Sequence, residues 1–521
     1  MKRFLLLFAV IGLILSIPAV HSQDSKVIKK IIGNGTADNQ TMNHLDILSN
    51  RFGGRLAGSD AYENAAEWCA SKFREWGMQV ELDETGEVPV GFNRGPWFGR
   101  MLGNGGMVLH FATPSYTSGT KGIQRGHVVL EPKNQTEFDR MKGKLKGAWV
   151  LICGTNTGWP IDYSEAGDST RTRIITENNE IEEKNREIQM QNRMNREAGE
   201  QQELLPYKEE PALFYRQMAD AGILGIIQSA PVPIRALYDR KNINNKTLTF
   251  DNLPTIPDIK LDEHQYRIIE QMAKERQYFE LEFDIRNHFR MGPVKYHNVI
   301  GIIPGTKYPD EYVIMGGHLD AFDVATGGVD DGSGLTPAME AARLIMKAEA
   351  KPKRTILVCL WAAEEFGLLG SKSWVERNHD KLDKISNMFN RDGGPTVANS
   401  LTATEAMYDD MAKICEPLND INPDFPFKLN KREGPPRPPR SGGTDSGSFA
   451  VVGVPTMTFG TADTKGYDFN YGEIWHTERD LYNMSIPEYQ EHTAVLTAIV
   501  VLGVANLDHL LSREDYYLIE E

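Results

Sequence analysis

Apolar runs in the C-terminal half of the chain constrain its fold most. The segment 355–361 is almost continuously apolar, which is typical of a central strand that is buried on both faces of a parallel sheet. Residues 312–316 form a shorter run of the same kind, and residues 384–390 form a weaker one. Between the runs at 312–316 and 355–361, the apolar spacing from Leu335 onward predicts a helix. Strands that alternate with helices predict an α/β fold.

Each of these runs leads into residues that can bind metal ions. His318 follows the run at 312–316, Glu364 and Glu365 follow the run at 355–361, and Asp392 follows the weaker strand. Asp330 lies in a turn of Gly, Asp and Ser just before the predicted helix. Ligands of open α/β sheets bind outside the carboxyl ends of the strands, so we expect these side chains to converge.

One more histidine completes a set with the composition that two zinc-like ions require. Each ion needs about four N or O ligands, and a catalytic pair must leave room for water. A carboxylate shared by both ions offsets their repulsion, and each ion then needs one His and one further acid. Two such ions, held about 3.5–4 Å apart, lower the pKa of a bridging water toward roughly 7. The set therefore predicts a hydrolase with two metal ions, and its members are His318, Asp330, Glu365, Asp392 and His476.

The order and context of these residues resemble those of the M28 family of zinc-dependent exopeptidases. The matching motifs are Gly-Gly-His318-Leu-Asp, Asp330-Asp-Gly-Ser-Gly, Glu-Glu365, Asn-Arg-Asp392 and Trp-His476-Thr. Each motif is weak alone, but all of them occur in order. The resemblance runs from about residue 43 to the C-terminus if an inserted domain is included. It implies the zinc exopeptidase fold, which has a mixed, mostly parallel central sheet with helices on both faces.

The resemblance also implies how two zinc ions would be held. Asp330 would bridge the ions, His318 and Asp392 would complete one site, and Glu365 and His476 would complete the other. Oxygen and imidazole ligands without a thiolate leave Co²⁺ and Mn²⁺ open as the native metal.

Two further roles are implied for the catalytic residues. Glu364 would act as general base and acid: it would take a proton from the metal-bridging water, which is the nucleophile, and pass it to the leaving amine. Asp320 would hold the imidazole of His318 and tune its basicity.

Three other acidic residues have competing interpretations. We expect Asp331 to cap the following helix or to rigidify its loop rather than to bind metal. Asp480 either orients a metal ligand or caps a helix. Asp445 lies in a Gly-Gly-Thr-Asp sequence that resembles a loop at the rim of the family's active site. It would pair with the free α-amine of a substrate, or it would belong to an ordinary turn.

A chain of 521 residues predicts two or three domains. We expect residues 23–121 and 290–521 to form the catalytic domain. The interruption, residues 122–289, has short apolar strands that resemble a β-rich protease-associated (PA) domain. In the family such an insert covers the active site, although a spacer that merely packs alongside is the alternative. Residues 170–210 are rich in Glu, Asn, Arg and Gln and lack an apolar stripe, so they predict a protruding helical arm, which could also bind a partner.

The N-terminus has the features of a signal peptide over residues 1–22. Lys2 and Arg3 precede an apolar core at 4–17, and cleavage after Ser22 would follow a small residue. The apolar core is short for a membrane span, so an uncleaved anchor is the less favoured reading. We therefore expect a periplasmic or secreted protein with no membrane span in its mature form. The net charge of −15 argues against a nucleic-acid partner.

Together these features predict an exported di-zinc exopeptidase that acts on peptides as an aminopeptidase or dipeptidase. A carboxypeptidase of the glutamate carboxypeptidase type is the nearer alternative, because relatives with a PA domain include such enzymes. Glutaminyl cyclases share the core but use one zinc and lack the insert. A non-catalytic, receptor-like binding protein is the alternative from another class, but such relatives have lost the metal ligands that this chain retains. A homodimer is compatible with the sequence, since relatives often dimerise.

Overall fold

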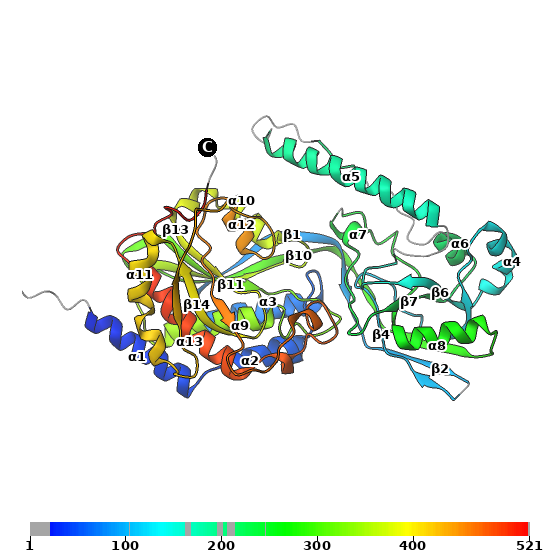
Figure 1. The fold of residues 1–521 in the computed structure, drawn as a ribbon, viewed down its shortest axis with the longest axis horizontal. Helices are drawn as coiled ribbons and strands as arrows, with labels where there is room; N and C mark the ends of the chain where they lie inside the picture. Colours follow the sequence, from blue (N-terminus) through cyan, green and yellow to red (C-terminus); the bar gives the residue numbers. More distant parts are fainter. Residues whose placement is uncertain are drawn as a thin grey trace, which may run out of the picture.

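The computed structural model shows a mixed α/β protein with two lobes, each built on its own sheet (Figure 1). The described residues are 21–103, 105–161, 168–194, 202–205, 214–244 and 246–518. Almost all of the segment expected to be a signal peptide, residues 1–22, lies outside them. Among the helices of the described residues, none combines the length and the apolar character that crossing a membrane requires.

The first lobe has a five-stranded sheet in the order β1-β10-β12-β11-β13. Its strands are β1 Gln79–Asn93, β10 His288–Ile303, β11 Tyr308–His318, β12 Arg354–Trp361 and β13 Ile385–Asn390. Strand β11 pairs in parallel with β12 and β13, whereas β10 pairs antiparallel with β1 and β12. The sheet is therefore mixed, as expected, but parallel and antiparallel pairings are equally common. The mostly parallel arrangement that the resemblance implied is found only for β11, β12 and β13, the strands that the apolar runs predicted.

Helices pack on both faces of this sheet, and β12 shows why its sequence is so apolar. Ile356 and Val358 belong to the core that includes residues of α3, α9 and α13. Leu357 and Cys359 point to the opposite face, where α10 and α12 pack. Every residue of β12 is buried, which explains the continuous apolar run from Ile356 to Trp361. These helices are α3 Asp60–Glu75, α9 Gly332–Lys347, α10 Leu369–Arg377, α12 Ser446–Ala450 and α13 Pro487–Ala505.

A small sheet and several short helices complete the first lobe. The three-stranded sheet has the order β15-β14-β16 and consists of β14 Val397–Ala403, β15 Lys428–Lys431 and β16 Gly460–Ala462. The remaining helical segments are α1 His21–Ala37, α2 Thr41–Leu45, η1 Asp46–Phe52, α11 Glu405–Cys415, η2 His379–Lys384, η3 Glu416–Asp420, η4 Tyr471–Glu473 and η5 Tyr482–Met484. Helix α1 begins at His21, so cleavage after Ser22 would remove only its first residues.

The second lobe has an eight-stranded sheet in the order β3-β2-β9-β5-β6-β7-β8-β4. Its strands are β2 Trp97–Leu102, β3 Met107–Val108, β4 Phe111–Ala112, β5 Gln124–Leu130, β6 Ala148–Thr155, β7 Gly225–Ala230, β8 Asp258–Asp262 and β9 Glu280–Ile285. Its shorter helices are α4 Gln135–Leu145, α6 Tyr215–Asp220, α7 Arg240–Asn244 and α8 Glu263–Lys274. Strands β2, β3 and β4 precede residue 122, where the sequence suggested that the insert begins. The long strands β1 and β10 extend from the first lobe toward the second (Figure 1).

The charged segment at 170–210 begins as one long helix, α5 Asp168–Met194, which projects along the outside of the second lobe (Figure 1). Residues 202–205 lie against this helix. The side chain of Asn185 exchanges two hydrogen bonds with the backbone of Leu205. The rest of the predicted arm, residues 195–201 and 206–210, lies outside the described residues.

Candidate metal centre

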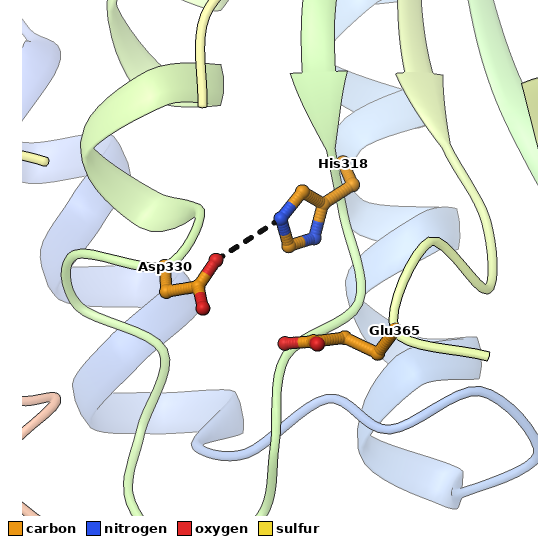
Figure 2. Close-up of side chains that lie close together, drawn as sticks. All are labelled: His318, Asp330 and Glu365. Carbon is orange, nitrogen blue, oxygen red and sulfur yellow. Dashed lines mark hydrogen bonds and ion pairs between the residues drawn. The ribbon is translucent and has the colours of Figure 1, made fainter. Parts of the chain in front are cut away.

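The residues expected to bind metal converge at the carboxyl ends of three strands. His318 is the last residue of β11, Glu365 follows β12, and Asp392 follows β13. Asp330 lies in the loop just before α9. Figure 2 shows the side chains of His318, Asp330 and Glu365 pointing toward one another, and one ligand atom from each lies within 4.8 Å of the others.

The five residues form one group, called here the acid–histidine cluster. The Nε2 atom of His318 lies 3.2 Å from Oδ1 of Asp330 and 3.8 Å from Oδ1 of Asp392. The Nε2 atom of His476 lies 3.4 Å from Oδ2 of Asp330 and 3.1 Å from Oε2 of Glu365. Asp330 thus lies between the two histidines, with one carboxylate oxygen toward each. This is the arrangement that a carboxylate shared by two cations requires.

The chemistry of the acid–histidine cluster fits a divalent metal ion. Asp330 Oδ2 and Glu365 Oε1 are buried and form no hydrogen bond with the described residues. Burying a carboxylate oxygen without a partner is costly, and a cation between these oxygens would satisfy them. Imidazole and carboxylate donors suit zinc and its first-row neighbours. The donor set is therefore what a metal centre needs.

The electrostatics of the acid–histidine cluster lead to the same conclusion. Burial alone would lower the pKa of His318, but the nearby carboxylates of Glu364, Asp330 and Asp392 raise it well above its ordinary value. Burial, reinforced by the charge of Asp330, raises the pKa of Glu365 well above its usual range. So many acids cannot all ionise in a small buried volume without positive charge. A bound divalent cation supplies that charge and reverses the local pKa preferences.

Asp320 contacts different groups from those predicted. The Nδ1 atom of His318 lies 2.8 Å from the backbone carbonyl oxygen of Asp320 but 3.8 Å from its carboxylate. The carboxylate instead accepts hydrogen bonds from the backbone N–H groups of Glu364, at 3.0 Å, and Glu365, at 3.2 Å. Asp320 therefore orients the imidazole through its main chain and fixes the Glu-Glu pair through its side chain. The sequence could not show this because the two segments meet only in the folded sheet.

Two further acids fix the loop that carries Asp330. The carboxylate of Asp331 accepts a hydrogen bond from the backbone N–H of His318 at 3.0 Å and does not cap α9. The carboxylate of Asp480 accepts hydrogen bonds from the backbone N–H groups of Val329, at 2.6 Å, and Asp330, at 3.3 Å. Of the alternatives offered for these residues, loop rigidification describes Asp331 and ligand orientation describes Asp480. The peptide bond between Asp330 and Asp331 is cis.

Asp445 does not lie where an α-amine of the substrate would reach it. Its side chain is fully buried at the start of α12, and neither carboxylate oxygen has a hydrogen-bond partner in the described part of the chain. Burial raises its pKa to about 7. The neighbouring Gly442 and Gly443 line the cavity instead. The geometry therefore gives no support to the predicted amine contact.

Glu364 faces the cavity from a fixed backbone. Its N–H donates to Asp320, and its carbonyl oxygen accepts hydrogen bonds from the backbone N–H groups of Gly367, at 2.7 Å, and Leu368, at 2.9 Å. Burial, with the charges of Glu365, Asp445 and Asp392, raises the pKa of Glu364 to about 10 and outweighs the opposing effect of His318. The side chain lines the cavity beside the acid–histidine cluster, where a general base is needed.

A cavity of about 690 Å³ opens onto the acid–histidine cluster. Its walls come from both lobes, since Thr157, Trp159 and Arg235 of the second lobe line it together with His476. This volume lies within the usual range for small-molecule sites, roughly 300–1,000 Å³. Sequence analysis missed the second-lobe residues because they lie in loops without a recognisable motif. Trp475 was also missed, although its position next to His476 was a usable signal.

Comparisons with known proteins agree with this geometry. Residues 298–500 match the model of peptidase family M28. Carboxypeptidase Q from Rattus norvegicus is 28% identical over 273 residues, which cover 50% of this chain and 52% of that protein. The chain thus matches about half the length of this relative.

Two solved structures share the fold. The peptidase M28 precursor from Shewanella amazonensis superposes with a TM-score of 0.56 at 19% identity, over 94% of this chain and 98% of that one. A zinc aminopeptidase from Bacillus subtilis gives a TM-score of 0.51 at 16% identity, over 92% of this chain and 97% of that one. The segment that matches the family model carries every residue of the acid–histidine cluster. Over residues 298–500, the chain is therefore similar to peptidase family M28.

Proposed function

We propose that the protein is a di-zinc exopeptidase that hydrolyses short peptides as an aminopeptidase or dipeptidase. The observation that carries the proposal is the position of Asp330 between two histidines, each of which has a second carboxylate beside it. His318 and Asp392 would hold one zinc ion, and His476 and Glu365 would hold the other. The zinc aminopeptidase of Bacillus subtilis, which shares the fold, supports this choice of metal.

The residues of the site would have separate roles in peptide hydrolysis. When bound, the zinc ions would polarise the scissile carbonyl and lower the pKa of water. Glu364 would accept a proton from the attacking water and donate it to the leaving amine, because its carboxylate faces the cavity from a backbone held on both sides. Asp320, Asp331 and Asp480 would keep the ligands in position through their hydrogen bonds to the backbone.

The second lobe would limit access to short substrates. Its loops contribute Trp159, Arg235 and Tyr238 to the cavity wall, which is the role proposed for a PA-like insert over residues 122–289. We also propose that residues 1–22 direct export, so that the mature protein works in the periplasm or outside the cell.

A carboxypeptidase is the second candidate, and the name of carboxypeptidase Q favours it. The two candidates coincide for a dipeptide, because cleavage of its one peptide bond releases both terminal residues. They differ for longer peptides, which would lose residues from opposite ends. A mixture of dipeptides and tripeptides therefore separates a dipeptidase from each of the other two activities.

Metal content and hydrolysis, measured on the same purified samples, test the proposal. We expect about two zinc ions per chain in the wild type and in Glu364→Gln, with activity roughly 100- to 10,000-fold lower in the variant. His318→Ala should lose metal and activity, whereas His379→Ala, which removes an exposed histidine, should change neither. An active Glu364→Gln protein would contradict the assigned mechanism. A wild type with no metal and no turnover would favour the receptor-like alternative.

A further inference from the structure

A positive charge lies in the wall of the cavity close to the acid–histidine cluster. Arg235 follows strand β7 and lines the same cavity as Asp330, Glu365 and His476. Its side chain is partly buried. Within the described part of the chain, no carboxylate lies within the 4.0 Å of its guanidinium that an ion pair requires. A partly buried cation that lacks an anion is costly, so its position calls for an explanation.

The backbone around Arg235 is hydrogen-bonded to the loop that carries His476. Ile234 donates its N–H to the carboxylate of Glu478 at 3.1 Å and accepts the N–H of Glu478 at 3.0 Å. Arg235 itself forms an isolated antiparallel bridge with Thr477. On the other side, Leu237 donates its N–H to the carbonyl oxygen of Gly158 at 2.8 Å. Arg235 is therefore presented from a fixed position, as recognition of a substrate requires.

The guanidinium of Arg235 stacks on Trp475, with its carbon 4.9 Å from the centre of the ring. The ring of Trp475 lies 4.0 Å from that of His476, centre to centre. Stacking occupies the face of a guanidinium and leaves the N–H groups at its edge free to bind an anion. The positive charge is close enough to contribute to the lowered pKa of His476, to about 4, of which burial is the main cause.

Two other cations line the cavity but are less suited to this role. Lys372 is exposed and donates a hydrogen bond to the carbonyl oxygen of Gly367 at 2.8 Å. Arg240 is exposed at the start of α7. Arg235, in contrast, is only partly exposed and stacks on an aromatic ring that lies beside His476.

We propose that Arg235 binds the free main-chain carboxylate of the substrate residue that follows the scissile bond. This inference rests on the proposed peptidase function and assigns the residue that would favour dipeptides. A guanidinium matches a carboxylate with two parallel hydrogen bonds. A single aromatic ring separates Arg235 from His476, and one substrate residue with its terminal carboxylate can span that gap. The same cation would repel a terminal amine, so it selects which end of the peptide occupies this part of the cavity.

Binding to zinc-loaded full-length protein tests the assignment without depending on turnover. In the Glu364→Gln background, calorimetry would compare the dipeptide Ala-Leu with its C-terminal amide. We expect Ala-Leu to bind roughly 10- to 100-fold more tightly, as the loss of a charge-assisted hydrogen-bonded pair implies. Adding Arg235→Gln should abolish this preference, and Arg235→Lys should restore part of it. Arg240→Gln, the matched loss of a cation from the same cavity, should leave it unchanged.

Other outcomes would overturn the assignment. If Ala-Leu and its amide bind with equal affinity, or if the preference for Ala-Leu survives Arg235→Gln, Arg235 does not bind the carboxylate. If the amide of Ala-Glu binds as tightly as Ala-Leu and depends on Arg235, the anion is a side chain instead. If Arg235→Gln loses bound zinc as well as the preference for the free carboxylate, Arg235 supports the position of His476 and does not bind the substrate.

The proposed function is judged separately, by turnover in protein that retains Glu364. If no peptide is cleaved but the Arg235-dependent preference is present, the peptidase function fails and the carboxylate site stands. If peptides are cleaved without that preference, the peptidase function stands and the role of Arg235 is wrong.

Discussion

At the scale of single residues, Asp320 links the strand end that carries His318 to the loop that carries the Glu-Glu pair. Its carboxylate accepts one backbone N–H from Glu364 and one from Glu365, with a separate oxygen for each. An ionised carboxylate can accept at both oxygens, whereas an amide can accept at only one. The position therefore requires an acid rather than merely a polar residue.

This requirement makes Asp320→Asn an informative variant. The amide would accept one N–H and turn its own donor toward the other, so we expect the Glu-Glu pair to shift. Changes in groups that orient metal ligands typically cost 10- to 100-fold in affinity or activity, so we expect kcat/KM to fall by roughly that factor and zinc content to fall with it. Kinetics and mass spectrometry on the same sample would measure both.

Asp331→Asn provides the matched comparison for Asp320→Asn. The carboxylate of Asp331 accepts a single backbone N–H, from His318, which an amide oxygen can also accept. We expect its kcat/KM to stay within about tenfold of the wild type, since only one hydrogen bond is at stake. An Asp320→Asn enzyme with wild-type turnover and zinc content would show that the two backbone contacts are dispensable.

The convergence of His318, Asp330, Glu365 and Asp392 could be predicted from the sequence because each follows a recognisable strand or lies in a recognisable turn. The hydrogen bonds that hold these residues in place could not be predicted. The hydrogen bonds of Asp320 and Asp480 connect segments that meet only in the folded sheet, and the burial of Asp445 depends on how α12 packs. Arg235 has no motif around it, and its place beside Trp475 depends on contact between the lobes.

At the scale of secondary-structure elements, β11 and β12 depend on one glycine. A Cβ atom at Gly316 would overlap the carbonyl oxygen of Cys359 in the neighbouring strand. That oxygen belongs to the backbone of a strand that is buried along its whole length, so it cannot move without disturbing the sheet. The glycine lies only two residues before His318, which ties the packing of these strands to the position of a proposed metal ligand.

We therefore expect Gly316→Ala to lower the free energy of unfolding by about 3 kcal/mol or more, at the upper end of the cost of overpacking a core. Gly143→Ala is the control, because among the described residues no atom outside the backbone of helix α4 itself lies within 4 Å of the added methyl group. That change should stabilise the protein by roughly 0.5–1 kcal/mol through helix propensity. Urea unfolding followed by circular dichroism would compare the two, and equal midpoints would contradict this account of the sheet.

The parallel strands were predictable because burial on both faces leaves a continuous apolar run. Strand direction was not, since side chains alternate with the same period in parallel and antiparallel strands. Strand β1 is partly exposed along much of its length, which weakens its apolar pattern. Strands β3 and β4 are two residues long each, too short for any periodicity to detect.

At the scale of the whole molecule, the lobes meet through residues far apart in the chain. His110 of the second lobe contacts the carboxylate of Glu478 at 2.7 Å through Nε2 and that of Asp262 at 3.1 Å through Nδ1. Glu478 also holds the backbone of Ile234 and lies two residues after His476. His110 is thus part of the contact that sets the second lobe against the metal-site loop. No local pattern in the sequence encodes such a contact.

The charge of His110 should make this contact depend on pH. Burial alone would lower its pKa, but the hydrogen bonds to Glu478 and Asp262 raise it above its ordinary value of 6.5. A group whose pKa is raised by folding adds stability that is fully present below the unfolded-state pKa and is lost as the pH rises through the folded-state pKa. We therefore expect the contact to loosen above pH 6.5. The effect should be modest, because the histidine side chain is 42% exposed and solvent screens its charge.

Hydrogen exchange at the backbone amide of Ile234, corrected for the intrinsic effect of pH, would measure this loosening. Protection should fall as the pH rises through the folded-state pKa of His110, while amides of β12 remain protected because they lie in the buried sheet. In His110→Gln the side chain carries no charge at any pH, so protection at Ile234 should be lower at the acidic end and should no longer change with pH. If the variant and the wild type show the same pH profile, the ionisation of His110 does not control how the second lobe rests on the His476 loop.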